Sequence, residues 1–163
     1  MTIRLLIPND AKAIAVLWHA GATESGAVDR AFLPRLSQQD YTKVVREELE
    51  SGAIFGWCAL SADELSIVAY LTAELVKESV EWQMESYLYV IDVDVDSSAR
   101  RQGHATRLLT KAAAHARALG LRRVELSWLA NDKRATEVWS RLGFRSYLHR
   151  GFIDLREPAD KRD

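Results

Sequence analysis

The stretch SSARRQGHATRLL, Ser97 to Leu109, follows the alternating segment YLYVIDVDV and precedes a run with apolar residues at helical spacing. Two adjacent arginines, Arg100 and Arg101, and two small residues, Gly103 and Ala105, stand where that helix begins. The first turn of a helix has unpaired N–H groups and a positive dipole end, and small residues let an anion approach them. The stretch therefore favours a local phosphate site, although arginines before a helix are also common in ordinary solvated loops.

Composition limits what such a site can serve. The 163 residues fit one domain of roughly 150 residues, and the apolar and charged fractions of 48% and 28% are typical of soluble proteins. A net charge of -1 gives no general field for nucleic acid, so no nucleic-acid partner is expected. The single Cys58 excludes an intrachain disulfide and suits a reducing compartment, and no 18 apolar residues run together. We therefore expect a soluble, cytoplasmic protein without a membrane partner.

The pattern of the remaining chain predicts alternating strands and helices. Ser37 and Asp40 resemble a capping box that opens a helix ending at Gly52, and Gly120 and Gly143 are expected to end two later helices. Strands are expected over 3–7, 53–60, 65–76, up to residue 95, 124–128 and 144–155, and helices after residue 10 and over 37–52, 104–119 and 132–142, with a loop over 21–36. This order indicates a mixed α/β sheet with helices on its faces.

Two motifs in order carry a family resemblance. The segment VDVDSSARRQGHATRLL, followed one helix and one strand later by NDKRATEVWSRLGF, resembles the GNAT superfamily of acetyl-CoA-dependent N-acetyltransferases. Arg100, Gly103 and Ala105 match that family's Arg/Gln-x-x-Gly-x-Gly/Ala pyrophosphate loop. Its later Asn-x-x-Ala … Gly-Phe segment is matched by Ala135, Leu142, Gly143 and Phe144, with Asp132 where Asn is usual and Asn131 one residue early. The resemblance covers about residues 88–144 at the level of motifs.

The resemblance implies a fold and a co-substrate. It implies a single N-acetyltransferase-like domain over residues 1–163, with a mostly antiparallel mixed sheet of about six or seven strands and about four flanking helices. Acetyl-CoA would be the co-substrate, and no metal is implied. Its pyrophosphate would lie on the amides of residues 102–106, and its pantetheine arm would pair with the main chain of residues 93–95. The residues implied to bind it are Val93, Val95, Arg100, Arg101, Gln102, Gly103, His104, Ala105, Thr106, Asn131 and Trp139. For His104 the amide, and not the side chain, is expected to matter.

A base is the next requirement, because a lysine-like amine with a pKa near ~10.4 is mostly charged at pH 7 and cannot attack a thioester. Alternation in YVIDVDVD places Asp92, Asp94 and Asp96 on one face of a strand and Ile91 with the following valines on the other. Asp92 falls where many family members carry an acidic residue, so it is the first candidate for base or amine binder. The alternative, that these aspartates are solvated surface, stays open.

Trp139 departs from the family pattern. That position often holds a Tyr that acts as acid for the leaving thiolate, and an indole cannot serve as a practical acid. Tyr147 or a water could substitute, or no acid is needed, because a thiol with a pKa near ~8.5 leaves tolerably as thiolate. The departure also motivates a second hypothesis, a non-catalytic acyl-CoA-binding or interaction module of the same fold.

Two segments leave the acceptor and the assembly open. The acceptor is expected to be an amine-bearing small molecule or peptide, chosen by residues 21–36 and 77–85. The final segment RSYLHRGFIDL is short for the family's usual two C-terminal strands. A truncated hairpin and a strand completed by a second subunit, which would make a homodimer, are both compatible with it.

Overall fold

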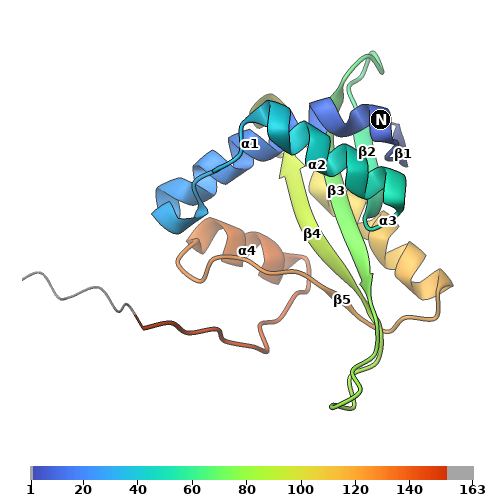
Figure 1. Ribbon diagram of the computed structural model, residues 1–163, viewed down its shortest axis with the longest axis vertical. Helices are drawn as coiled ribbons and strands as arrows, with labels where there is room; N and C mark the ends of the chain where they lie inside the picture. Colours follow the sequence, from blue (N-terminus) through green and yellow to red (C-terminus); the bar gives the residue numbers. More distant parts are fainter. Residues whose placement is uncertain (1, 154–163) are drawn as a thin grey trace, which may run out of the picture.

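The computed structural model describes residues 2–153, and its elements follow the order expected from the sequence (Figure 1). The helices are α1 (Ala11–Val28), α2 (Gln38–Ser51), α3 (His104–Ala118) and α4 (Lys133–Arg141), with short 3-10 turns η1 (Pro8–Asp10), η2 (Arg30–Phe32) and η3 (Ser97–Ala99). The strands are β1 (Ile3–Leu5), β2 (Phe55–Leu60), β3 (Ile67–Val76), β4 (Tyr87–Val95) and β5 (Val124–Glu125).

One mixed sheet forms the centre of the molecule. Its strand order is β1-β2-β3-β4-β5, with antiparallel neighbours from β1 to β4 and a parallel β4–β5 pair. Helix α3 supplies the crossover that a parallel pair needs. The expectation of a mostly antiparallel mixed α/β sheet with four α-helices is confirmed. The expected strand count is too high, because the described residues form five strands and residues 144–153, expected to be the last one, form none.

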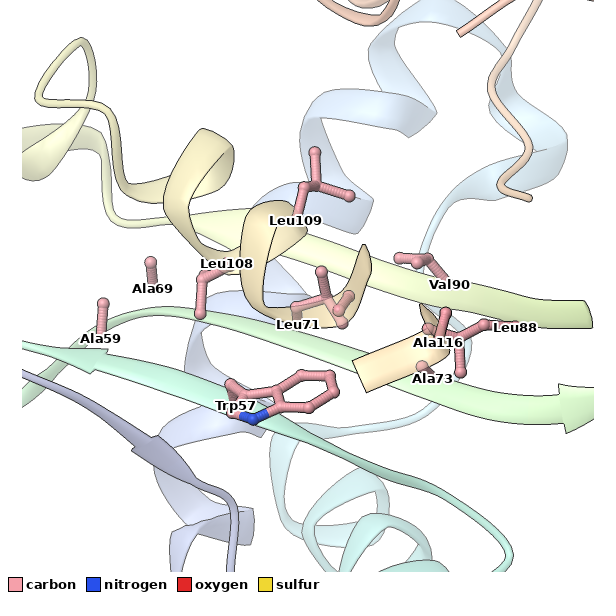
Figure 2. Packing of buried hydrophobic residues seen from close by; sticks show 11 residues of the cluster. Trp57, Ala59, Ala69, Leu71, Ala73, Leu88, Val90, Leu108, Leu109 and Ala116 are labelled. Carbon is pink, nitrogen blue, oxygen red and sulfur yellow. The ribbon is translucent and has the colours of Figure 1, made fainter. Parts of the chain in front are cut away.

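The two faces of the sheet carry separate cores. Alternation along β2 sends Trp57 toward α3 and its neighbour Cys58 toward α1 and α2. On the α3 face Trp57, Leu71 and Leu108 pack together, as Figure 2 shows. The opposite core is formed by Ala11, Ile14, Leu17, Val45, Cys58 and Tyr70. Burial on both faces fixes the register of β3 and β4, because a one-residue slip would reverse every side chain.

Helix α1 is longer than the sequence predicts. The expected loop over 21–36 is wrong in its first part, since α1 continues to Val28. Gly21 and Gly26 both lie inside this helix, and at each of them another side chain approaches closely: a Cβ built on Gly26 would lie 2.4 Å from Cδ2 of Leu33. These glycines serve helix packing, so tertiary contact overrides their low helix propensity.

The other helix ends agree with the sequence signals. The Ser37 hydroxyl accepts the N–H of Asp40 at 3.1 Å, and α2 is followed by Gly52 in the left-handed conformation. Asp132 caps α4 by accepting the N–H of Ala135 at 2.8 Å, and Gly143 follows that helix with φ 89°. None of the helices in the described part is long and apolar enough to cross a membrane.

Candidate functional site

A β-bulge in β4 shapes the site. Thr72 of β3 pairs with Asp92 and Ala73 pairs with Val90, so Ile91 is an extra residue without a cross-strand partner. Its side chain is 40% exposed, whereas Val93 and Val95 pack against the α3-side core. The expectation that Ile91 shares a face with these valines is therefore wrong, because the bulge shifts the alternation at that residue.

Beyond the bulge, β4 presents a free main-chain edge. Strand β5 pairs with β4 only through Leu88–Val124 and Tyr89–Glu125, and it ends at Glu125, three residues before its expected end at residue 128. The N–H of Asp96 donates to Val68 of β3, while the carbonyl of Val95 accepts from Arg100. Since hydrogen-bonding directions alternate along a strand, Val95 and Val93 turn their main-chain groups away from β3. An extended ligand can pair with that edge.

The loop before α3 exposes backbone amides. Arg101 and Gly103 have positive φ values of 64° and 80°, which curve the chain before His104 begins the helix. A Cβ built on Gly103 meets nothing within 4 Å, so this turn faces open space. Curved backbone with left-handed residues and a helix N-terminus both favour anions. Arg101, Gln102, Gly103 and Thr106 are exposed, and Ala105 is half-buried.

Two side chains of this loop have surroundings that the sequence did not predict. Nη2 of Arg100 lies 2.5 Å from Oε1 of Glu24 in α1, and its Nε donates to the Val95 carbonyl at 3.2 Å. His104 is 6% exposed, and its Nδ1 has no hydrogen-bond partner among the described residues. Burial lowers the pKa of His104, so its imidazole is neutral at pH 7 and adds no charge to the loop.

Asp92 and Asp94 lie half-buried on the α1–α2 face of β4, each paired with a tyrosine. The Tyr41 hydroxyl, from α2, is 3.4 Å from Oδ2 of Asp92, and the Tyr70 hydroxyl, from β3, donates to Oδ2 of Asp94 at 2.9 Å. Burial raises the pKa of Asp92 to about 6 and that of Asp94 to about 7. The alternative of fully solvated aspartates is therefore wrong for these two carboxylates.

Helix α1 lies directly over Asp94. A Cβ built on Gly21 would be 2.0 Å from Oδ1 of Asp94, so the carboxylate occupies the space that any other residue at position 21 would fill. Beside it, the rings of Trp18 and Tyr41 stack with centroids 3.8 Å apart. The aromatic pair, the two carboxylates and Tyr70 thus form one cluster, to which α1, α2, β3 and β4 all contribute.

The remaining residues singled out from the sequence, Asn131, Trp139 and Tyr147, lie in or next to α4. Trp139 is half-buried, packs against the α3-side core and lies edge-on to Phe144 with centroids 6.0 Å apart. Asn131 is exposed, immediately before the cap of α4. Tyr147 donates to Glu125 at 2.7 Å, which raises the pKa of its hydroxyl. That engagement makes Tyr147 a poor replacement for the missing acid.

Sequence reasoning missed the partners of these residues. Tyr41, Tyr70 and Glu24 lie 51, 24 and 76 residues away from the groups they contact, and no local pattern links them. Gly21, expected to begin a loop, lies inside α1, and a glycine at a helical position can indicate the close approach of another residue, here Asp94. Segment 77–85, expected to help choose the acceptor, lies in the β3–β4 turn at the opposite end of β4, about 25 Å along the strand from residue 96. Among residues 2–153 no group of side chains suited to a metal ion is found.

Comparison with known proteins adds the family. The model of the acetyltransferase (GNAT) family matches residues 22–144, and no curated protein matches the chain. Among solved structures, a tetramutant of the BH1408 protein from Bacillus halodurans has a TM-score of 0.79 at 20% identity, covering 95% of this chain and 100% of its own. A predicted acetyltransferase from Clostridium acetobutylicum, solved with acetyl-CoA, has 0.72 at 15%, covering 98% and 99%. An aminoglycoside acetyltransferase from an uncultured soil sample has 0.71 at 19%, covering 95% and 96%. At these identities the likeness shows a shared fold.

Proposed function

Because this chain belongs to the GNAT acetyltransferase family, we propose that it is an N-acetyltransferase that moves the acetyl group of acetyl-CoA to a primary amine. Transfer would occur by direct attack of the amine in a ternary complex. The observation that carries the proposal is the pair of positive-φ residues, Arg101 and Gly103, that open the backbone at the start of α3 beside the free edge of β4.

The residues present fit acetyl-CoA. The amides of residues 102–106 would hold its pyrophosphate, and Arg100 and Arg101 would add positive charge. The main-chain groups of Val93 and Val95 would pair with the pantetheine arm, since they face away from β3. Bound there, the co-substrate supplies an activated acyl group, and the chain supplies position and a base.

Asp92 is proposed as the base. A carboxyl with a pKa of about 6 is mostly ionised at pH 7, yet it holds a proton better than an ordinary aspartate. It can therefore accept a proton from the ammonium group of the acceptor, and at pH 7 it can release that proton to solvent before the next turnover. The Tyr41 hydroxyl, 3.4 Å from Oδ2 of Asp92, would limit the rotation of the carboxylate, and the ring of Trp18 stacks on that of Tyr41.

The second candidate function is an acyl-CoA-binding module without catalysis. Trp139 favours it, because the indole fills the core against Phe144 where the family often has an acidic phenol. Binding of CoA without release of free thiol over a broad amine panel would support the module. Aminoglycosides belong in that panel, since a structural neighbour carries that name, together with polyamines, peptides and lysine-containing proteins.

The experiment that tests the proposal is CoA titration by calorimetry on wild type and Gly103→Glu. A carboxylate at the open turn would oppose the pyrophosphate by charge and bulk, so we expect binding to be lost. Gly120→Glu is the matched control, because Gly120 also has a positive φ, 76°, and open space, but lies after the other end of α3. Equal CoA affinity in a folded Gly103→Glu variant would overturn the cofactor assignment.

A further inference from the structure

Glu24 joins three elements at the edge of the proposed cofactor site. It stands on the C-terminal half of α1, and its carboxylate contacts Arg100, in the loop before α3, at 2.5 Å. The other carboxylate oxygen lies 3.8 Å from Nη1 of Arg134, near the start of α4. The two basic partners come from the two motifs that define the family pattern, and the acid comes from neither.

The guanidinium of Arg100 is shared between an acid and the edge of β4. Its Nε donates to the Val95 carbonyl and its Nη2 to Glu24, so it lies between α1 and the strand. A carboxylate and a phosphate bind a guanidinium through the same planar array of N–H donors. Glu24 and the pyrophosphate would therefore compete for Arg100.

Glu24 also acts on the aspartate face. Its charge raises the pKa of Asp94, whereas the charge of Arg100 lowers it, so the three groups lie within electrostatic reach of one another. When a phosphate neutralises Arg100, Asp94 loses the positive charge that lowers its pKa, and Glu24 loses the nearer of its two basic partners and keeps Arg134. The α1 side of β4 then becomes more negative, which favours a cationic acceptor over a neutral or acidic one.

We propose that Glu24 is a positioning residue that holds Arg100 as its counter-ion until acetyl-CoA displaces it, and so couples cofactor binding to a more acidic acceptor face. The inference rests on the proposed function, because it takes the loop before α3 as the pyrophosphate site. It adds a residue outside both family motifs and a direction for its effect: Glu24 opposes CoA binding.

The test is CoA affinity, measured by calorimetry on the full chain at low salt. Glu24→Gln removes the charge and keeps the shape, so CoA should bind at least about threefold more tightly, the scale of one exposed ion pair. The matched control is Glu81→Gln, which makes the same charge change in the β3–β4 turn, at the far end of the sheet from α3's start (Figure 1). Its CoA affinity should equal that of wild type.

A double-mutant cycle separates competition from a general field. If Glu24 acts by occupying Arg100, the gain from Glu24→Gln should shrink or vanish in an Arg100→Ala background. A full gain in that background, or unchanged or weaker CoA binding by Glu24→Gln alone, would overturn the inference and leave the acetyltransferase proposal standing. Absence of CoA binding by wild type would instead overturn the proposed function and this inference with it.

Discussion

At the scale of single residues, the site depends on two carboxylates that burial keeps partly protonated. Asp92 and Asp94 are two positions apart on β4, and each is hydrogen-bonded by a tyrosine from another element. The raised pKa values mean that burying the charged forms costs more free energy than the tyrosines return. Strongly shifted pKa values are common where a proton is taken or released, which supports the role proposed for Asp92.

Asp92→Asn should lower turnover mainly at neutral pH. The amide cannot accept a proton, so we expect a loss of about 10²-fold or more near pH 7, with recovery at high pH where more acceptor is already neutral. Wild-type activity should fall as pH drops through about 6, where Asp92 becomes protonated. Thiol release across pH 5.5 to 10 measures both, and equal losses at every pH would assign Asp92 to substrate binding or structure.

Asp94→Asn should stabilise the fold more at high pH than at low pH. The folded-state pKa of about 7 lies above the ordinary value of 3.8, so the folded chain binds more protons than the unfolded chain between these values. Wild-type stability is therefore lost as pH rises through that window, and the neutral amide escapes the loss. Urea unfolding at pH 5 and pH 8 measures it. Asp63→Asn is the control without a pH dependence: hydrogen bonds lower the pKa of exposed Asp63 below 3.8, so this carboxylate is ionised in the folded and the unfolded chain at both pH values, and the effect of the substitution should be the same at pH 5 and pH 8.

At the scale of elements, α1 is positioned by what lies beneath it. Its C-terminal half crosses the end of β4, where Gly21 leaves room for the Asp94 carboxylate and Glu24 reaches Arg100 (Figure 1). A glycine inside a helix costs about 1 kcal/mol relative to alanine, so close approach is the reason to keep it. The close packing of α1 on β4 therefore depends on the contact between Gly21 and Asp94.

Gly21→Ala tests the contact between Gly21 and Asp94. Alanine normally stabilises a helix interior by up to about 1 kcal/mol, but here its Cβ would overlap Asp94, so we expect no gain or a loss. In an Asp94→Ala background the overlap is gone, and the same substitution should stabilise the chain. Urea unfolding of the four proteins gives the coupling energy. Equal effects of Gly21→Ala in both backgrounds would contradict the contact.

At the scale of the whole molecule, α3 joins stability to the proposed cofactor site. Leu108 and Ala116 of α3 pack on the sheet, as Figure 2 shows, and Ala112 belongs to the same core. The turn at Gly103 begins the same helix, whose first N–H groups are not capped by a side chain. This packing fixes the position of the helix N-terminus, where we propose that the pyrophosphate binds. A ligand bound there stabilises the folded chain against unfolding as a unit.

Acetyl-CoA should therefore raise the melting temperature. A ligand at a concentration of about 100 times its dissociation constant raises the free energy of unfolding by about 2.7 kcal/mol. For a domain of this size that corresponds to a rise in melting temperature of roughly 5 to 10 °C. Differential scanning fluorimetry measures the shift. Gly103→Glu should show no shift, while Gly120→Glu, which has the same backbone cost, should keep it; a shift of equal size in both would place the ligand elsewhere.

Local sequence patterns predicted most of the helices and strands, and the turn before α3 where we propose that phosphate binds. The local patterns are the alternation of β2 to β4, the Ser37 cap, the glycines that end α2 and α4, and Gly103 immediately before α3. Each of these patterns depends only on residues a few positions apart, so it can be recognised without knowledge of the tertiary structure. They also placed Asp92 and Asp94 on one strand face, on which the proposed base rests.

Tertiary structure alone decided the rest. The bulge at Ile91 belongs to the pairing of β4 with β3, β5 ends at Glu125, and residues 144–153 form no strand, and no local pattern in the sequence indicates any of the three. The tyrosine partners of the aspartates and the Glu24–Arg100 pair bring together groups 24 to 76 residues apart. Burial then sets the pKa values, because desolvation depends on every element packed around a carboxylate and on none of its sequence neighbours alone.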